Sequence, residues 1–136
     1  MHQRLRLGTR HGAAVAVAAV SVVLLSAGPA IADSGNAYTS DTGDIAGHTH
    51  FDDRIDVYTV YDDDKDSEGV VGWIEVRQAN GSWKGYERLY VGTGNNTHRS
   101  AYRDIQREGA DVRIWACRQN GSGGSPYSCG RAVVRG

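Results

Sequence analysis

The fold of this chain is decided by one stretch, Val70-Val71-Gly72-Trp73-Ile74-Glu75-Val76-Arg77-Gln78, followed by Ala79-Asn80-Gly81-Ser82 and residues 83–91. Two runs rich in β-branched and aromatic residues flank an Asn-Gly pair, which is the strongest short-range signal for a β-hairpin. If Asn80 and Gly81 form a two-residue turn, the numbers of paired residues sum to 161. This register predicts a core face that carries Val70, Gly72, Ile74 and Val76 opposite Val91, Leu89, Glu87 and Gly85.

The other face of the predicted hairpin combines aromatic and basic side chains. Arg77 would lie directly opposite Lys84, an arrangement of like charges that destabilises a sheet and that an anionic ligand would relieve. Aromatic rings among arginines and lysines also suit a protein interface or stacking on sugars. The alternative is that this face packs beneath a second layer. The candidate binding residues are Trp73, Arg77, Lys84, Tyr86, Arg88 and Tyr90.

Further strands are predicted over residues 55–61, 110–118 and 130–135, and residues 62–69, 92–100 and 120–128 are expected to be loops. In the segment 110–118, Val112, Ile114 and Ala116 alternate onto one face. Residues 101–109 fit either a short strand or a brief helical turn. Short strands with closely spaced turn signals predict an all-β protein, a small antiparallel β-sandwich or barrel.

The first 32 residues have the pattern of a secretory signal peptide. Arg4, Arg6 and Arg10 precede an apolar run over residues 13–25, and Ala30-Ile31-Ala32 gives the cleavage pattern before Asp33. The apolar run is too short to predict a membrane span. We therefore expect a secreted, extracellular protein that begins near Asp33.

Charge divides the remaining chain into two parts. Residues 33–68 hold 11 acidic and 2 basic residues, whereas residues 69–136 hold 5 acidic and 10 basic residues. Residues 33–53 are polar with few large apolar side chains, so they are expected to form a flexible acidic N-terminal arm. A single β domain is expected over residues 54–136. Its basic half could pair with the arm or bind a polyanion.

Both cysteines, Cys117 and Cys129, lie in the exported part, where an oxidising compartment favours a disulfide. Closing a loop of this length stabilises a protein by about 3 kcal/mol in the chain-entropy model. Because so short a chain buries only a modest core, such added stabilisation is expected.

Two segments are candidate metal sites. The acidic loop places Asp62, Asp64, Asp66 and Glu68 at alternate positions, which could supply oxygen ligands to calcium, although Lys65 lies among them and the EF-hand pattern fails. His48 and His50, with Asp52, would project to one side of an extended segment and could hold a transition metal. No cofactor is otherwise expected.

Enzyme signatures are sparse. There is no nucleophile elbow, zinc-protease motif or phosphate-binding loop. A small hydrolase or toxin remains an alternative, and its discriminating feature would be His98 meeting a carboxylate in a cleft. A calcium-stabilised structural module is a third alternative.

The chain resembles small secreted proteins of streptomycetes and related actinobacteria. The resemblance lies in the signal ending Ala30-Ile31-Ala32 and in the closing pattern from Val112-Arg113-Ile114-Trp115-Ala116-Cys117 through the glycine-serine loop to Cys129. It implies a small secreted β protein, and some members of that group are thought to be accessory subunits of secreted assemblies. The sequence thus favours a non-catalytic binding protein, whose partner is another secreted protein or a cell-surface glycan or polyanion. A nucleic acid is not an expected partner, and no membrane span is expected.

Overall fold

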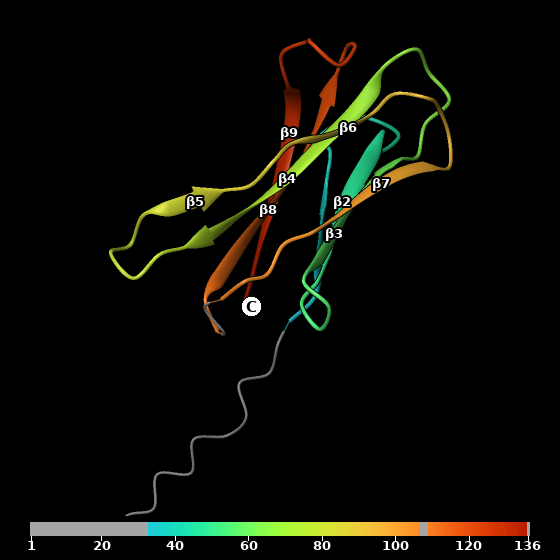
Figure 1. Cartoon of the computed structure of the whole chain (residues 1–136). Coiled ribbons are helices and arrows are strands. Elements are labelled where there is room, and N and C mark those ends of the chain that lie inside the picture. The colour runs from blue at the N-terminus through green and yellow to red at the C-terminus, as the bar shows by residue number, and fades with distance from the viewer. Residues whose placement is uncertain (1–32, 107–108, 136) are drawn as a thin grey trace, which may run out of the picture.

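The computed structural model describes residues 33–106 and 109–135, and these residues form nine β-strands and no helix (Figure 1). The predicted all-β class is therefore confirmed. The proposed signal peptide lies outside the described residues. The strands are β1 (Gly35–Tyr38), β2 (Gly47–Asp52), β3 (Val57–Asp62), β4 (Gly69–Arg77), β5 (Trp83–Gly85), β6 (Leu89–Val91), β7 (Thr97–Tyr102), β8 (Asp111–Gln119) and β9 (Tyr127–Arg135).

The strands form two antiparallel sheets that pack face to face. Sheet A has the order β1-β2-β3-β7, and sheet B has the order β5-β4-β8-β9, with β6 also paired to β4. The hairpin of β4 and β5 extends beyond the rest of the sandwich (Figure 1). Consequently, each sheet has one face turned to the core and one outer face.

The two sheets meet along one edge, where β1 lies beside β9. The Asp33 N–H donates to the Arg135 carbonyl at 2.8 Å, and the Ser40 N–H donates to the Ser128 carbonyl at 2.9 Å. A Cβ atom at Gly130 would lie 1.8 Å from the Tyr38 carbonyl oxygen, so only glycine permits this approach. These contacts protect two strand edges that would otherwise be open to pairing with another chain.

The core fills the space between the sheets. Phe51 and Tyr58 of sheet A meet Ile74, Val112 and Ile114 of sheet B, and all five side chains are fully buried. The phenol of Tyr58 donates to the Glu87 carbonyl at 2.7 Å, and burial raises the pKa of Tyr58 to about 12. The predicted inward side chains on these two strands are thus confirmed, namely Val70, Ile74, Val76, Val112, Ile114 and Ala116.

The hairpin register agrees with the sequence in one half and differs in the other. Val70 pairs with Val91 and Gly72 with Leu89, as predicted, but Val76 pairs with Lys84. The β5–β6 side therefore holds one extra residue, a β-bulge. The turn also differs, because Gly81 alone adopts a positive φ, of 83°, and its N–H donates to the Gln78 carbonyl. This is a longer turn with glycine in the left-handed position, not a two-residue Asn-Gly turn.

The predicted flexible arm is the main correction. Residues 33–53 hold β1 and β2, which pair with each other and, through β2, with β3. Ala37, Thr49 and Phe51 are buried within this segment. Along β2, Gly47, Thr49 and Phe51 turn inward while His48 and His50 turn outward. The polar composition of the segment made this alternation hard to recognise. A single buried aromatic residue with two small neighbours is enough to hold the strand.

The disulfide is confirmed, since Cys117 of β8 is bonded to Cys129 of β9. Two predicted loops are shorter than expected, because β7 begins at Thr97 and β9 begins at Tyr127. Of residues 101–109, which fitted either a strand or a helical turn, Ala101 and Tyr102 complete β7. Residues 103–106 continue without regular structure.

Candidate binding face

The structure divides the six predicted binding residues between two surfaces. Trp73, Arg88 and Tyr90 lie together on the outer face of sheet B, and Arg77 lies on that face near the end of β4. Because of the bulge, Lys84 and Tyr86 instead lie on the inner side, where Tyr86 packs against the core. Arg77 faces Trp83, so the predicted repulsion between Arg77 and Lys84 is wrong.

A row of four side chains crosses the outer face of sheet B. Trp73 pairs with Trp115, and their rings stack with centroids 5.5 Å apart and planes 12° from parallel. The Arg88 guanidinium lies 4.2 Å from the Trp73 ring centroid, and that of Arg131 lies 5.7 Å from the Trp115 centroid. The two stacked indoles are therefore flanked by cations, which the electron-rich ring faces attract.

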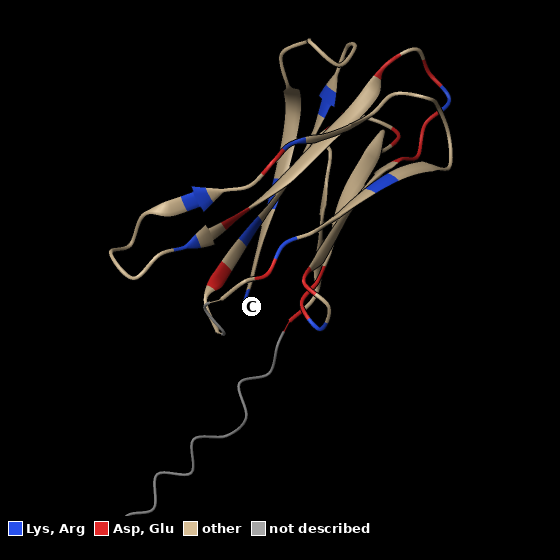
Figure 2. Ribbon diagram, in the orientation of Figure 1, with Lys and Arg blue, Asp and Glu red and all other residues tan. Residues whose placement is uncertain are grey.

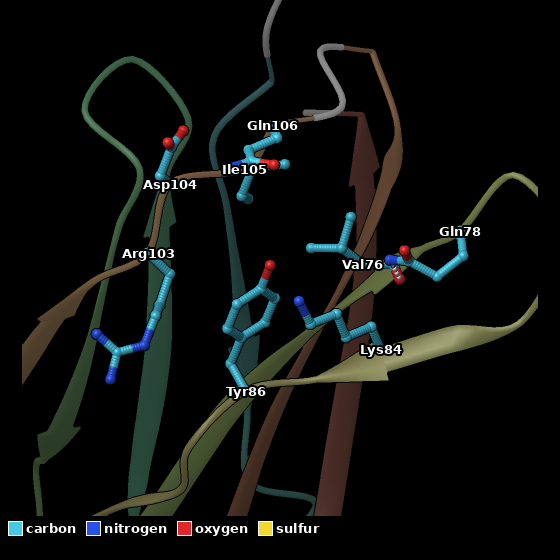
Figure 3. Close-up of a pocket in the computed structure, with 8 residues that line it drawn as sticks. All are labelled: Val76, Gln78, Lys84, Tyr86, Arg103, Asp104, Ile105 and Gln106. Carbon is cyan, nitrogen blue, oxygen red and sulfur yellow. Dashed lines mark hydrogen bonds between the residues drawn. The ribbon is translucent and has the colours of Figure 1, made fainter.

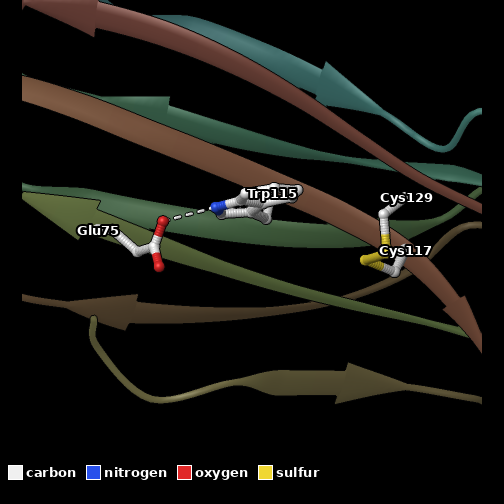
Figure 4. The surroundings of a disulfide bond; sticks show 4 residues. All are labelled: Glu75, Trp115, Cys117 and Cys129. Atoms are coloured by element: carbon white, nitrogen blue, oxygen red, sulfur yellow. Dashed lines mark hydrogen bonds between the residues drawn. A yellow bond between two sulfur atoms is a disulfide. The ribbon is translucent and has the colours of Figure 1, made fainter. Parts of the chain in front are cut away.

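A second group lies beside this row. The Arg113 guanidinium is 4.2 Å from the Trp83 ring centroid, and its Nε donates to Glu75 Oε2. The Trp115 Nε1–H donates to the same oxygen at 2.7 Å (Figure 4). Burial raises the pKa of Glu75, but the hydrogen bonds from Arg113 and Trp115 outweigh this effect and lower it overall. Glu75 therefore stays ionised and fixes both partners.

We refer to Trp73, Trp83, Arg88, Arg113, Trp115 and Arg131 as the Trp–Arg face. Trp73 is only 8% exposed, and it forms a buried cluster with Val71 and Cys117, against which Tyr90 and Trp115 pack. Cys117 of this cluster is bonded to Cys129 (Figure 4). Figure 2 shows basic residues on the strands of sheet B, whereas acidic residues gather in turns beside sheet A.

Sequence reasoning missed four residues of the Trp–Arg face, and three of them carried a usable signal. In the segment 110–118, Val112, Ile114 and Ala116 were assigned to the core, so alternation already placed Arg113 and Trp115 on the opposite face. The same argument along β9 gives Arg131. What the sequence did not show is that β8 is the neighbour of β4, and this pairing brings Trp115 beside Trp73.

Lys84 and Tyr86 line a cavity of about 320 Å³ at the end of the sandwich (Figure 3). The Lys84 ammonium lies 5.4 Å from the Tyr86 ring centroid. Arg103, on the opposite wall, forms a 2.5 Å ion pair with Glu87. Glu87 is the one acidic residue of the predicted core face, and this ion pair balances its charge. Gln78, Asp104 and Gln106 are the other polar residues that line this cavity.

The acidic loop is neutralised within the protein. Arg118 of β8 forms ion pairs with Asp66, with Glu68 at 3.0 Å and with Asp41 at 3.5 Å. Burial lowers the pKa of Arg118, but the surrounding carboxylates outweigh this effect and raise it. Of the other two candidate calcium ligands, Asp62 is buried and Asp64 Oδ1 accepts the Lys65 N–H. Asp66 and Glu68 therefore converge on the Arg118 guanidinium.

The described histidines all belong to sheet A. His48 and His50 lie on β2 and His98 lies on β7. His98 packs against Tyr61, with ring centroids 5.6 Å apart, and forms no ion pair with a described carboxylate. The proposed hydrolase feature is therefore not formed by His98, whereas His48 contacts Asp63 at 2.5 Å.

Within residues 33–106 and 109–135, no group of three or more His, Cys, Asp or Glu side chains is arranged to hold a metal ion. No helix in this part of the chain is long and apolar enough to cross a membrane. No family model, curated protein or solved structure matches the chain.

Proposed function

We propose that this chain is a secreted, non-catalytic binding protein and that the Trp–Arg face binds an acidic polysaccharide at a cell surface. One observation carries the proposal. Arg88 and Arg131 are exposed at the two ends of the stacked tryptophan row, and neither forms a salt bridge with any residue that the structure describes. These two guanidiniums remain available to anionic groups of a ligand.

The geometry favours an anion over a neutral sugar. A sugar ring stacks on the face of an aromatic side chain, but one face of Trp73 is covered by Arg88 and the other by Trp115. What the surface presents is guanidinium, which binds carboxylate, sulfate or phosphate through paired hydrogen bonds. Because the indoles hold these arginines in place, less side-chain entropy is lost when an anion binds.

The spacing favours a polymer over a single small anion. Arg88 and Arg131 lie at the two ends of a row that crosses neighbouring strands of sheet B. At the usual spacing of strands, the two residues are roughly 14 Å apart. Arg113 lies between them on the next row. A ligand that contacts both Arg88 and Arg131 must carry negative charges at separated points along its length, which is the property of an acidic polysaccharide.

A matched pair of double variants tests the proposal. Binding of fluorescently labelled heparin, a sulfated polysaccharide, is measured by anisotropy at several salt concentrations, with neutral dextran as the ligand control. Replacing Arg88→Gln and Arg131→Gln should lower the affinity at least tenfold and make its salt dependence shallower. Replacing Lys65→Gln and Arg99→Gln removes the same charge from other surfaces and should have a much smaller effect.

Equal losses in both double variants would mean that net charge, and not this face, attracts the polymer, and would overturn the proposal. Absence of heparin binding by the unmodified chain would also overturn it. In that case the other partner class, a second secreted protein, is the one to test, by affinity capture from culture supernatant with the same two double variants.

A further inference from the structure

On the outer face of sheet A, two histidines lie next to each other along β2. His48 and His50 are separated by one residue, and both turn outward because side chains alternate along a strand. Their Cα atoms are therefore roughly 6.7 Å apart, twice the rise per residue. Thr49, between them, is buried and faces the core. The two imidazoles thus share one surface of a well-formed strand.

Hydrogen bonding fixes the tautomer of both rings. The Nδ1 atom of His48 lies 2.5 Å from Asp63 Oδ2, and that of His50 lies 2.9 Å from Asn36 Oδ1. A carboxylate oxygen and an amide oxygen only accept hydrogen bonds, so each Nδ1 carries the proton. In the neutral rings, both Nε2 atoms therefore keep a free lone pair, which is the form of histidine that binds a metal ion.

The orientation of His48 directs its lone pair along the strand. Its ring stacks on Tyr61 of the neighbouring strand, with centroids 4.5 Å apart and planes 8° from parallel, so the ring plane runs along β2. Asp63 lies at the far end of β2 from His50, because its N–H donates to the Ala46 carbonyl. The Nδ1 edge of His48 thus faces away from His50, and the opposite edge, with Nε2, faces toward it.

We propose that His48 and His50 together bind a divalent transition-metal ion through their Nε2 atoms. The Asp63 carboxylate and the Asn36 amide oxygen contact the Nδ1 atoms and so orient the two rings, as the hydrogen-bond partners of metal-binding histidines commonly do. No third described His, Cys, Asp or Glu joins them, so water fills the remaining positions. Such a two-imidazole site favours copper(II), with zinc(II) bound more weakly, according to the usual order of affinities.

The experiment is a calorimetric titration of the full chain, purified without a histidine tag, with copper(II) chloride and separately with zinc(II) chloride. Electron paramagnetic resonance of the copper complex reports the number of nitrogen ligands. The unmodified chain should bind one copper ion with two imidazole nitrogens, and more tightly than zinc. His48→Ala and His50→Ala should each weaken this binding at least tenfold, whereas His98→Ala on β7 should leave it unchanged.

Asp63→Asn tests the positioning role separately. The variant should still bind copper through two nitrogens but about tenfold more weakly, since an amide holds the Nδ1 proton less strongly than a carboxylate. Circular dichroism shows whether each variant keeps its sheets. Copper binding that survives the combined His48→Ala and His50→Ala change, or that weakens equally in the His98→Ala variant, would overturn the proposal.

Discussion

On the outer face of sheet B, one row of side chains runs Arg88, Trp73, Trp115, Arg131, whereas on sheet A the corresponding row runs Tyr38, His48, Tyr61, His98. In both rows, aromatic rings on neighbouring strands stand side by side and stack. The difference lies in the groups between and beside the rings. Sheet B ends its row with permanent cations, whereas sheet A carries imidazoles, of which the His48 ring hydrogen-bonds to Asp63.

The two rows also differ in burial. Trp73 is 8% exposed, while Tyr38 is 48% exposed. The row on sheet B is therefore both a small second core and a charged surface, and the row on sheet A contributes mainly as a surface. The same packing unit, a ladder of aromatic side chains across a sheet, therefore presents guanidinium groups at the surface of sheet B and imidazole groups at the surface of sheet A.

The first prediction tests whether sheet A belongs to the fold at all. Phe51 of β2 is fully buried, so Phe51→Ala should lower the free energy of unfolding by about 3–5 kcal/mol, measured by urea denaturation. Ile55, in the turn that follows, is 57% exposed, and Ile55→Ala should change stability by about 0.5 kcal/mol at most. Equal, small effects of both changes would mean that residues 33–53 are detachable from the domain.

The second prediction concerns the Cys117–Cys129 disulfide, which lies beneath the Trp–Arg face. Cys117→Ala combined with Cys129→Ala opens the bridge across the loop between β8 and β9 and should cost about 3 kcal/mol. The tryptophan emission should shift to longer wavelength, because Trp73 packs against Cys117. If stability falls without any change in emission, the disulfide supports the fold but not this face.

The third prediction compares the two rows directly. Trp73→Ala removes a nearly buried indole and should destabilise the protein by about 2–3 kcal/mol. Tyr61→Ala removes a partly buried ring from the middle of the other row and should cost about 1 kcal/mol. Urea denaturation of the two variants gives the difference, and a reversed order would show that sheet A, and not sheet B, carries the more stabilising row.

Much of sheet B was predictable from the sequence, because its strands are long and alternate clearly. The inward positions of Ile74 and Val112 follow from period-two patterning alone. The bulge opposite Trp73 and Ile74 was not predictable, because the Asn-Gly pair is compatible with both a two-residue and a longer turn. That single extra residue moved Lys84 and Tyr86 away from the candidate face and placed Trp83 on it.

Sheet A was mostly missed, for a different physical reason. In β2, the inward side chains are Gly47, Thr49 and Phe51, so the strand is almost as polar as a loop. Small residues are required there because the sheets approach closely: a Cβ atom at Gly72 of β4 would lie 2.0 Å from Thr49 Oγ1. Composition therefore predicted disorder, whereas long-range packing against sheet B orders the segment.

The last prediction uses Asp62, the one buried carboxylate among the described residues. Asp62 is 1% exposed, and its Oδ1 atom has no hydrogen-bond partner among the described residues, while Oδ2 accepts the Gly94 N–H at 3.2 Å. Burial raises the pKa of Asp62 above its usual value of 3.8. The folded state therefore resists ionisation more than the unfolded state does, so this group favours folding at low pH.

Its contribution is lost as the pH rises from about 4 through the raised pKa. Asp62→Asn removes the charge and keeps the acceptor for Gly94, so the variant should melt at a higher temperature than the unmodified chain at pH 7 and at nearly the same temperature at pH 3. Asp44→Asn, at an exposed position, should show no such pH-dependent difference. A constant gap between Asp62→Asn and the unmodified chain at every pH would mean that altered packing, and not the buried charge, sets the effect.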